Sequence, residues 1–156
     1  LSTVVLATVL ELRNGGWRVF PIWYLSAVLG TVFQALITTR FVFILGSSGG
    51  VYALLAAFLS ELVMNWSEIV FRWLYLALFV LIVGLELVVV STFPQPNIAY
   101  GSHFAGGVYG FALGLCMVRN WRWKRHEYIV LFASASFVLV ATVILLCSIP
   151  QILVED

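Results

Sequence analysis

Apolar runs separated by short polar turns make up almost the whole chain. A membrane-spanning helix needs about 20 mostly apolar residues. Runs that meet or approach this length occupy 19–38, 45–66, 69–90, 103–118 and 128–149. An opening run over 1–12 is too short to span and has the length of the end of such a helix. The pattern predicts an all-α fold, a polytopic membrane helical bundle that forms a single domain over 1–156.

Polar turns and prolines set the expected ends of these helices. We expect a short turn at 13–18, a second turn at 38–40, and an uncharged loop with two prolines at 91–100. Pro21 lies in the first turn of its run, where a missing N–H costs little. Pro150 is expected to end the last helix.

Composition supports a membrane class. The chain is 63% hydrophobic and 10% charged, with a mean hydropathy of +1.09, against about 45–50% and about 25% in soluble domains. The few basic residues form no interleaved basic and aromatic surface, so nucleic acid is not an expected partner. Cys116 and Cys147 are expected near opposite membrane faces, too far apart for a disulfide.

The placement of charge predicts an orientation in the membrane. If the loops alternate across the bilayer, seven of the eight Lys and Arg residues fall on one side: Arg13, Arg18, Arg72, Arg119, Arg122, Lys124 and Arg125. The other side receives only Arg40. The positive-inside rule makes the first side cytoplasmic. The C-terminus is then non-cytoplasmic, as is the break at 46–50.

A glycine- and serine-rich break, 46–50, interrupts one apolar run. Bare backbone at membrane depth is tolerated only where it is buried in protein or lines a wet cavity. Ser48 in this break and His103 downstream fall at similar depth under the predicted orientation. Taken alone, each residue has a purely structural explanation. Ser48 could be a small residue at a kink, and His103 an interfacial or hydrogen-bonded histidine. Together they favour a serine–histidine dyad.

Small residues follow both candidates at helical spacing. One stripe is Gly49, Ala53, Ala56 and Ser60, and the other is His103, Gly107, Gly110 and Gly114, with a second series at Gly106, Gly110 and Gly114. Such stripes let membrane helices approach closely. Helix packing alone explains them, and the same packing would bring Ser48 near His103.

The chemistry of the pair is that of acyl transfer. A serine hydroxyl becomes a useful nucleophile when a neighbouring base takes its proton, and such help contributes about 10²–10⁴-fold. Backbone N–H groups of 46–50 are candidates for binding the oxyanion.

No Asp or Glu residue lies near Ser48 or His103 in the sequence. Glu86 is the nearest one within a membrane span, and the favoured reading is that it is protonated, hydrogen-bonded or at the interface. Tyr52, one turn after Ser48, is a candidate to stack on the imidazole in place of an acid.

At these residues the chain resembles a rhomboid intramembrane serine protease. Gly46-Ser47-Ser48-Gly49 matches the family's G-x-S-G motif, Tyr52 its following tyrosine, and His103, Gly106 and Gly110 its histidine motif. The break also fits the G-x-S-x-G elbow of α/β-hydrolases, but its flanks are membrane spans rather than a strand and a helix. The run at 128–149 resembles the extra helix of six-plus-one eukaryotic secretase-type rhomboids.

The resemblance implies the rhomboid fold from its second core helix onward, with Ser48 as nucleophile, His103 as general base, and Tyr52, Gly46 and Gly49 as support. It implies cleavage of single-span membrane proteins near the lumenal or extracellular face, in the secretory pathway or plasma membrane of a eukaryote. No cofactor or metal is expected. The family's first helix, Trp-Arg loop motif and oxyanion His and Asn are expected upstream of Leu1, and we expect the stretch 1–156 alone to be inactive.

Two other functions remain open. A catalytically inactive rhomboid-like protein would bind transmembrane clients, although such proteins typically lack Ser48 or His103. A transporter or channel also uses broken helices, but the chain shows no internal repeat and no charged conduction path.

Overall fold

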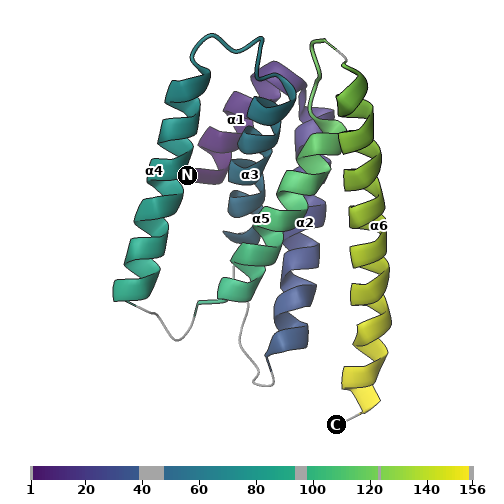
Figure 1. Ribbon diagram of the computed structural model, residues 1–156. Helices are drawn as coiled ribbons and strands as arrows, with labels where there is room; N and C mark the ends of the chain where they lie inside the picture. The colour runs from purple at the N-terminus through teal and green to yellow at the C-terminus, as the bar shows by residue number, and fades with distance from the viewer. Residues whose placement is uncertain (1, 39–47, 94–97, 123, 155–156) are drawn as a thin grey trace.

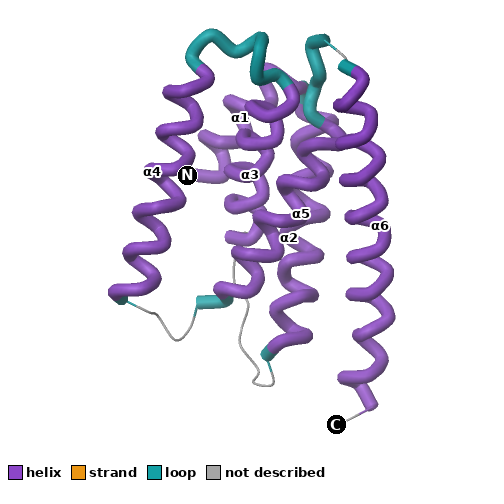
Figure 2. Tube along the Cα trace, in the orientation of Figure 1, coloured by secondary structure: helices purple, strands orange, loops and turns teal. Residues whose placement is uncertain are grey.

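Six helices make up the computed structural model, which describes residues 2–38, 48–93, 98–122 and 124–154, with side chains as far as 149. The helices are α1 (Ser2–Asn14), α2 (Gly16–Ile37), α3 (Ser48–Met64), α4 (Arg72–Thr92), α5 (Tyr100–Met117) and α6 (Arg125–Val154) (Figure 1). The described ranges contain no strand (Figure 2). The chain therefore folds as an all-α bundle.

Helix α5 lies at the centre of the bundle and packs on α2, α3 and α6. Helix α1 contacts α2 and α3, whereas α4 packs mainly on α3 and buries none of its residues. In Figure 1, α4 stands at one side of the bundle and α6 at the other. The connections α1–α2, α3–α4 and α5–α6 lie together at the top of that view. The bundle is thus a tight group around α5 with α4 at its edge.

Close contact between α3 and α5 depends on residues without side chains. A Cβ atom built on Gly106 would run into the Gly49 carbonyl, and one on Gly110 would run into Ala53. At the far end Gly114 faces Ser60, whose hydroxyl donates a 2.8 Å hydrogen bond to the Phe111 carbonyl. The face used on α5 is therefore Gly106, Gly110 and Gly114, which brings the two backbones together.

The expectation that Gly107 belongs to this packing face is wrong. A Cβ on Gly107 would meet nothing within 4 Å, and the residue lines a cavity instead. Consecutive helical residues differ by about 100° in direction, so Gly107 points away from the contact made by Gly106. On α3 the predicted Ala53 is fully buried, and so is Ala57, whereas the predicted Ala56 lines the same cavity.

Several helix ends differ from the sequence-based expectation. Helix α4 begins at Arg72 rather than at 69, and α5 and α6 begin at Tyr100 and Arg125 rather than at 103 and 128. The turn expected at 13–18 shrinks to Gly15, whose φ of +85° reverses the chain and favours glycine. Trp17 and Arg18 therefore belong to α2. Pro150 does not end the last helix, because α6 continues to Val154. One proline removes a single backbone donor, a loss that membrane helices tolerate.

Two buried asparagines tie the connection after α5 to the bundle. Asn14 Oδ1 accepts the Arg119 N–H at 2.8 Å, and Asn65 Oδ1 accepts the Trp121 N–H at 2.9 Å. Asn65 Nδ2 also donates to the Arg119 carbonyl at 3.0 Å. These bonds satisfy backbone groups that the end of α5 leaves without helical partners, and they fix α5 relative to α1 and α3.

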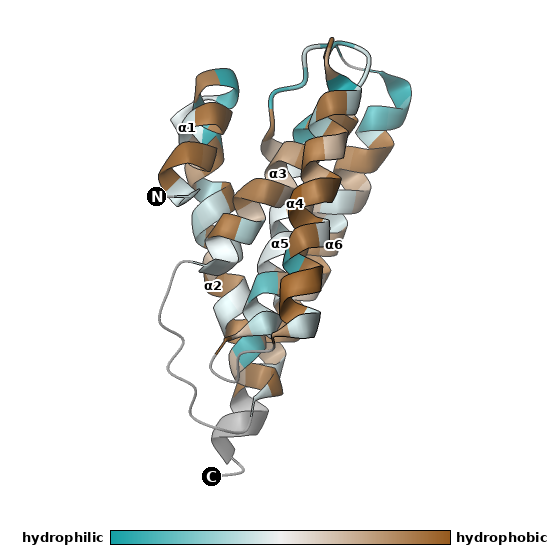
Figure 3. Ribbon diagram, turned by 90° about the vertical axis from the view of Figure 1, so that its left-hand side faces the viewer, coloured by the Kyte–Doolittle hydropathy of each residue, from teal (hydrophilic) through white to brown (hydrophobic). Residues whose placement is uncertain are grey.

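The outer faces of the bundle are apolar. Among the described residues, α2, α4 and the part of α6 from Arg125 to Ile149 are long and apolar enough to cross a membrane. In Figure 3 most of α4 is hydrophobic, whereas hydrophilic residues gather at the upper connections. Large apolar side chains such as Leu81, Val88 and Ile144 are about half exposed or more. A lipid environment suits such surfaces.

Candidate active site

Ser48 and His103 are brought together by the packing of α3 on α5. Ser48 is the first residue of α3, and His103 lies in the first turn of α5. The Ser48 Oγ and His103 Nε2 atoms are 2.9 Å apart. This is the reach required between a nucleophile and its base. The pair is held by the contact between Gly49 and Gly106, one of the tightest backbone approaches in the bundle.

Helix α3 is short for a membrane helix. Its 17 residues extend about 26 Å at 1.5 Å per residue, less than the roughly 30 Å of a bilayer core. In Figure 1 its N-terminal end lies above the lower ends of α2 and α4, inside the bundle. The first N–H groups of α3, beginning at Ser48, have no helical acceptors. The site therefore combines a hydroxyl, an imidazole and backbone donors at the first turns of α3 and α5.

Two tyrosine rings surround the imidazole. The Tyr52 ring stacks on His103 with centroids 4.4 Å apart and an interplanar angle of 19°. The Tyr100 ring lies edge-on at 6.2 Å and 85°. Tyr52 follows Ser48 by one helical turn, so both side chains lie on the same face of α3. The imidazole plane is thus set by contacts with aromatic rings.

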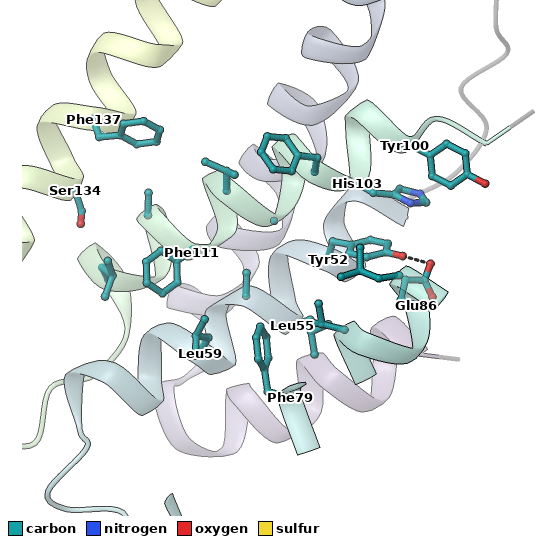
Figure 4. A pocket seen from close by; sticks show the side chains of 18 of the residues that line it. Tyr52, Leu55, Leu59, Phe79, Glu86, Tyr100, His103, Phe111, Ser134 and Phe137 are labelled. Carbon is teal, nitrogen blue, oxygen red and sulfur yellow. Dashed lines mark hydrogen bonds between the residues drawn. The ribbon is translucent and has the colours of Figure 1, made fainter. Parts of the chain in front are cut away.

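Glu86 of α4 reaches the same site. Its Oε1 atom accepts a hydrogen bond from the Tyr52 hydroxyl, drawn as a dashed line in Figure 4. Of the three readings considered for Glu86, the structure therefore shows the hydrogen-bonded one. Within the described ranges, His103 has no ion pair with a carboxylate. The carboxyl group at this site is hydrogen-bonded to the tyrosine that stacks on the histidine.

An apolar cavity of about 790 Å³ opens beside the pair. His103, Tyr52 and Glu86 lie at one end of it in Figure 4, and Phe111, Ser134 and Phe137 lie at the other. Its walls come from α3, α4, α5 and α6. The cavity joins the candidate site to the apolar surface between α4 and α6.

Gln34 supports the site and was not identified from the sequence. Its Oε1 atom accepts the Ser102 N–H at 3.1 Å, and its Nε2 atom donates to Thr38 at 2.5 Å. Close approach at Gly30, where a Cβ would meet the Ser102 carbonyl at 2.7 Å, adds to this contact. Together they fix the first turn of α5, which carries His103. In the sequence, the signal that could have identified Gln34 is a glutamine within an otherwise apolar membrane span.

The remaining residues singled out in the sequence are two glycines of the break and the two cysteines. Gly46 is outside the described residues, whereas Gly49 is buried against α5. In the part of the chain that the structure describes, no three His, Cys, Asp or Glu side chains are placed to hold a metal ion. Cys116 and Cys147 are both free thiols.

Comparison with known proteins identifies the family. The Rhomboid domain model matches residues 1–120. The chain is 31% identical over 137 residues to Rhomboid-related protein 1 of Caenorhabditis elegans, covering 82% of this chain and 38% of that protein. It is 29% identical over 128 residues to Rhomboid-related protein 3 of Homo sapiens, covering 76% and 31%.

A fungal relative carries a name that states an activity. The chain is 28% identical over 111 residues to Rhomboid-type serine protease 2 of Emericella nidulans, covering 71% of this chain and 22% of that protein. The chain thus spans well under half the length of these relatives. No solved structure gives a significant match. Since the domain model covers most of its length and the helices are of membrane-spanning type, the chain belongs to the rhomboid family of membrane proteins.

Proposed function

We propose that the protein is an intramembrane serine endopeptidase. The observation that carries the proposal is the 2.9 Å separation between Ser48 Oγ and His103 Nε2 at the inner end of a short helix. Family membership and the name of the fungal relative support the same reaction class. The second function considered, binding of transmembrane clients without cleavage, needs no such pairing.

In the proposed reaction Ser48 Oγ attacks the carbonyl carbon of a peptide bond. His103 Nε2 takes the hydroxyl proton as the new C–O bond forms, and the carbonyl oxygen becomes an oxyanion. The C–N bond then breaks as the imidazolium gives its proton to the leaving nitrogen, which leaves an ester on Ser48. Water, deprotonated by His103, hydrolyses the ester and restores the serine.

Backbone donors at the start of α3 are the groups we assign to the oxyanion. The N–H groups of Ser48 and Gly49 lie at the positive end of the α3 dipole and have no helical acceptors. Donors fixed in this way stabilise developing charge without reorganisation. The lack of a side chain at Gly49 lets α5 approach this end of α3, since an added Cβ would meet the Ser102 carbonyl at 3.0 Å.

The proposed orientation puts the site toward the lumenal or extracellular face. Seven of the eight cations lie in the three connections at the upper end of Figure 1 or in the helix turns next to them, and the positive-inside rule assigns that end to the cytoplasm. The C-terminus is then non-cytoplasmic. We assign the protein to a eukaryotic secretory or plasma membrane, with single-span membrane proteins as substrates and no metal or cofactor.

The test is cleavage of a single-span reporter by the full-length protein in cells. We expect a lumenal fragment to be released by the unmodified protein and by Ser91→Ala, which alters an exposed serine on α4. Ser48→Ala and His103→Ala should release none at equal expression. Release that persists in Ser48→Ala would overturn the nucleophile assignment. Reporter that co-purifies uncut with all four proteins would favour the client-binding function.

A further inference from the structure

Glu86 is an unusual residue for its helix. Apart from Arg72 at the first position, α4 contains no other charged residue and is otherwise strongly apolar. A carboxyl group within a membrane span is costly and usually marks a function. Glu86 is only half-buried, and it lines the cavities on both sides of α4. A role in filling the core does not explain its presence.

Three contacts connect Glu86 to the nucleophile. The Tyr52 hydroxyl donates to Glu86, the Tyr52 ring stacks on His103 at 4.4 Å, and His103 Nε2 lies 2.9 Å from Ser48 Oγ. The three side chains Glu86, Tyr52 and His103 come from α4, α3 and α5. Figure 4 shows them side by side at one end of the cavity.

We propose that Glu86 is a positioning residue for His103 that acts through Tyr52, and that it takes the place of the acid in a serine–histidine–acid triad. This inference rests on the proposed protease function. The role assigned to Glu86 requires no contact with the substrate or with the reacting atoms. Tyr52 keeps its proton throughout, so no proton passes along the chain of contacts.

The proposed effect has two physical parts. The hydrogen bond restrains rotation of the Tyr52 ring, and a fixed ring restrains the imidazole stacked on it. When His103 takes the serine proton it becomes a cation lying over the Tyr52 face, an arrangement that aromatic rings favour. A carboxylate bonded to the hydroxyl polarises the ring and strengthens that attraction. An acid in a triad provides the same orientation and charge stabilisation by direct contact.

The alternative is that Glu86 only fastens α4 to the bundle. In that case the loss of Glu86 would alter stability or substrate binding but not the reactivity of Ser48. The two roles differ in what a small serine-directed reagent measures. A fluorophosphonate reports activation of the hydroxyl without a transmembrane substrate.

The experiment measures the rate constant for fluorophosphonate labelling and the kcat and KM for a reporter, using the full-length protein in membranes. The variants are Glu86→Gln, Tyr52→Phe and the double variant, with Val89→Ala as a control on an exposed position of α4. Glu86→Gln keeps an acceptor of the same size but removes the charge. Thermal unfolding in detergent confirms that each variant is folded.

We expect Glu86→Gln and Tyr52→Phe each to slow labelling and lower kcat by about 10- to 100-fold, the range seen when a partner that orients a functional group is removed. KM should change little. The double variant should be no slower than the slower single variant, because both changes act on the same interaction between Tyr52 and Glu86. Val89→Ala should label at the unmodified rate.

Two results would overturn the inference while leaving the proposed function intact. One is labelling of Glu86→Gln at the unmodified rate. The other is a double variant whose loss is the product of the two single losses, which would mean independent roles. Failure of the unmodified protein to label at all would instead overturn the proposed function and the inference with it.

Discussion

The Tyr52 ring lies flat against the His103 imidazole, with centroids 4.4 Å apart and planes 19° from parallel. This contact joins α3 and α5 at the position where the histidine approaches Ser48. In a soluble serine protease a carboxylate contacts the histidine directly, whereas here an aromatic face does so and the carboxyl group of Glu86 is bonded to the far end of that ring. An aromatic face orients the imidazole and favours the cation that would form in the proposed reaction.

Substitutions of Tyr52 should give a graded loss of activity. Tyr52→Phe keeps the stacked ring and removes the hydroxyl that donates to Glu86. Tyr52→Ala removes both, so it should lower kcat further than Tyr52→Phe. Cleavage of a reporter by the full-length protein measures the series. Equal losses in the two variants would assign the whole effect to the hydroxyl and contradict a role for stacking.

Two neighbouring glycines on α5 should respond in opposite ways to the same change. Gly110→Ala places a Cβ against Ala53, so it should separate α3 from α5, cost about 1–3 kcal/mol in stability and abolish cleavage. Gly107→Ala places a Cβ in open space and should leave stability unchanged or slightly raised, since alanine favours helix. Thermal unfolding in detergent and reporter cleavage measure both. Equal destabilisation by the two variants would contradict the close contact at Gly110.

Asn65→Ala should destabilise the connection between α5 and α6. It leaves the Trp121 N–H and the Arg119 carbonyl without the bonds they make to Asn65. Both bonds are part-buried, and the net contribution of one hydrogen bond is about 0.5–1.5 kcal/mol. The melting temperature should fall relative to Val63→Ala, a control at an exposed position of α3. Unchanged melting in Asn65→Ala would show that water or a local shift replaces both bonds.

The ion pair between Arg13 and Glu61 should show strong coupling. Arg13 Nε lies 3.2 Å from Glu61 Oε1, and the Glu61 side chain is almost wholly buried. Arg13→Met leaves a buried carboxylate unpaired, which costs about 3–5 kcal/mol. Adding Glu61→Met should recover most of that loss, although the contacts of Arg13 with the Tyr75 and Trp121 rings stay lost. Chemical unfolding in detergent measures the free energy of unfolding of the two single variants and the double variant. A double variant as unstable as Arg13→Met would contradict an energetic coupling between Arg13 and Glu61.

Spacing in the sequence was sufficient to predict the pairing of Ser48 with His103. Small residues at helical intervals after each one predict a close helix contact, and the charge distribution predicts equal depth. The small-residue spacing is local to each helix, and the charge distribution depends only on the order of the loops, so both hold whatever the sideways arrangement of the remaining helices. The packing face itself was predicted less well, because Gly106 and Gly107 differ only in direction around α5.

The contacts of Glu86 and Gln34 could not be predicted in the same way. Both depend on how α4 or α2 is rotated and shifted relative to its neighbours, and an apolar helix surrounded by lipid has little periodicity to indicate this. Pro150 shows another limit, since a proline ends a helix in a soluble protein more often than in a membrane span. A polar residue within an apolar run signals a partner but does not identify it.

The most direct test of the proposed protease is to locate a fluorophosphonate adduct in the full-length protein purified from membranes. Peptide mass spectrometry should find the adduct on Ser48, and labelling should disappear in Ser48→Ala and in His103→Ala, because the hydroxyl is activated only when the imidazole accepts its proton. An adduct on another serine, or labelling that His103→Ala leaves unchanged, would contradict a catalytic pair formed by Ser48 and His103.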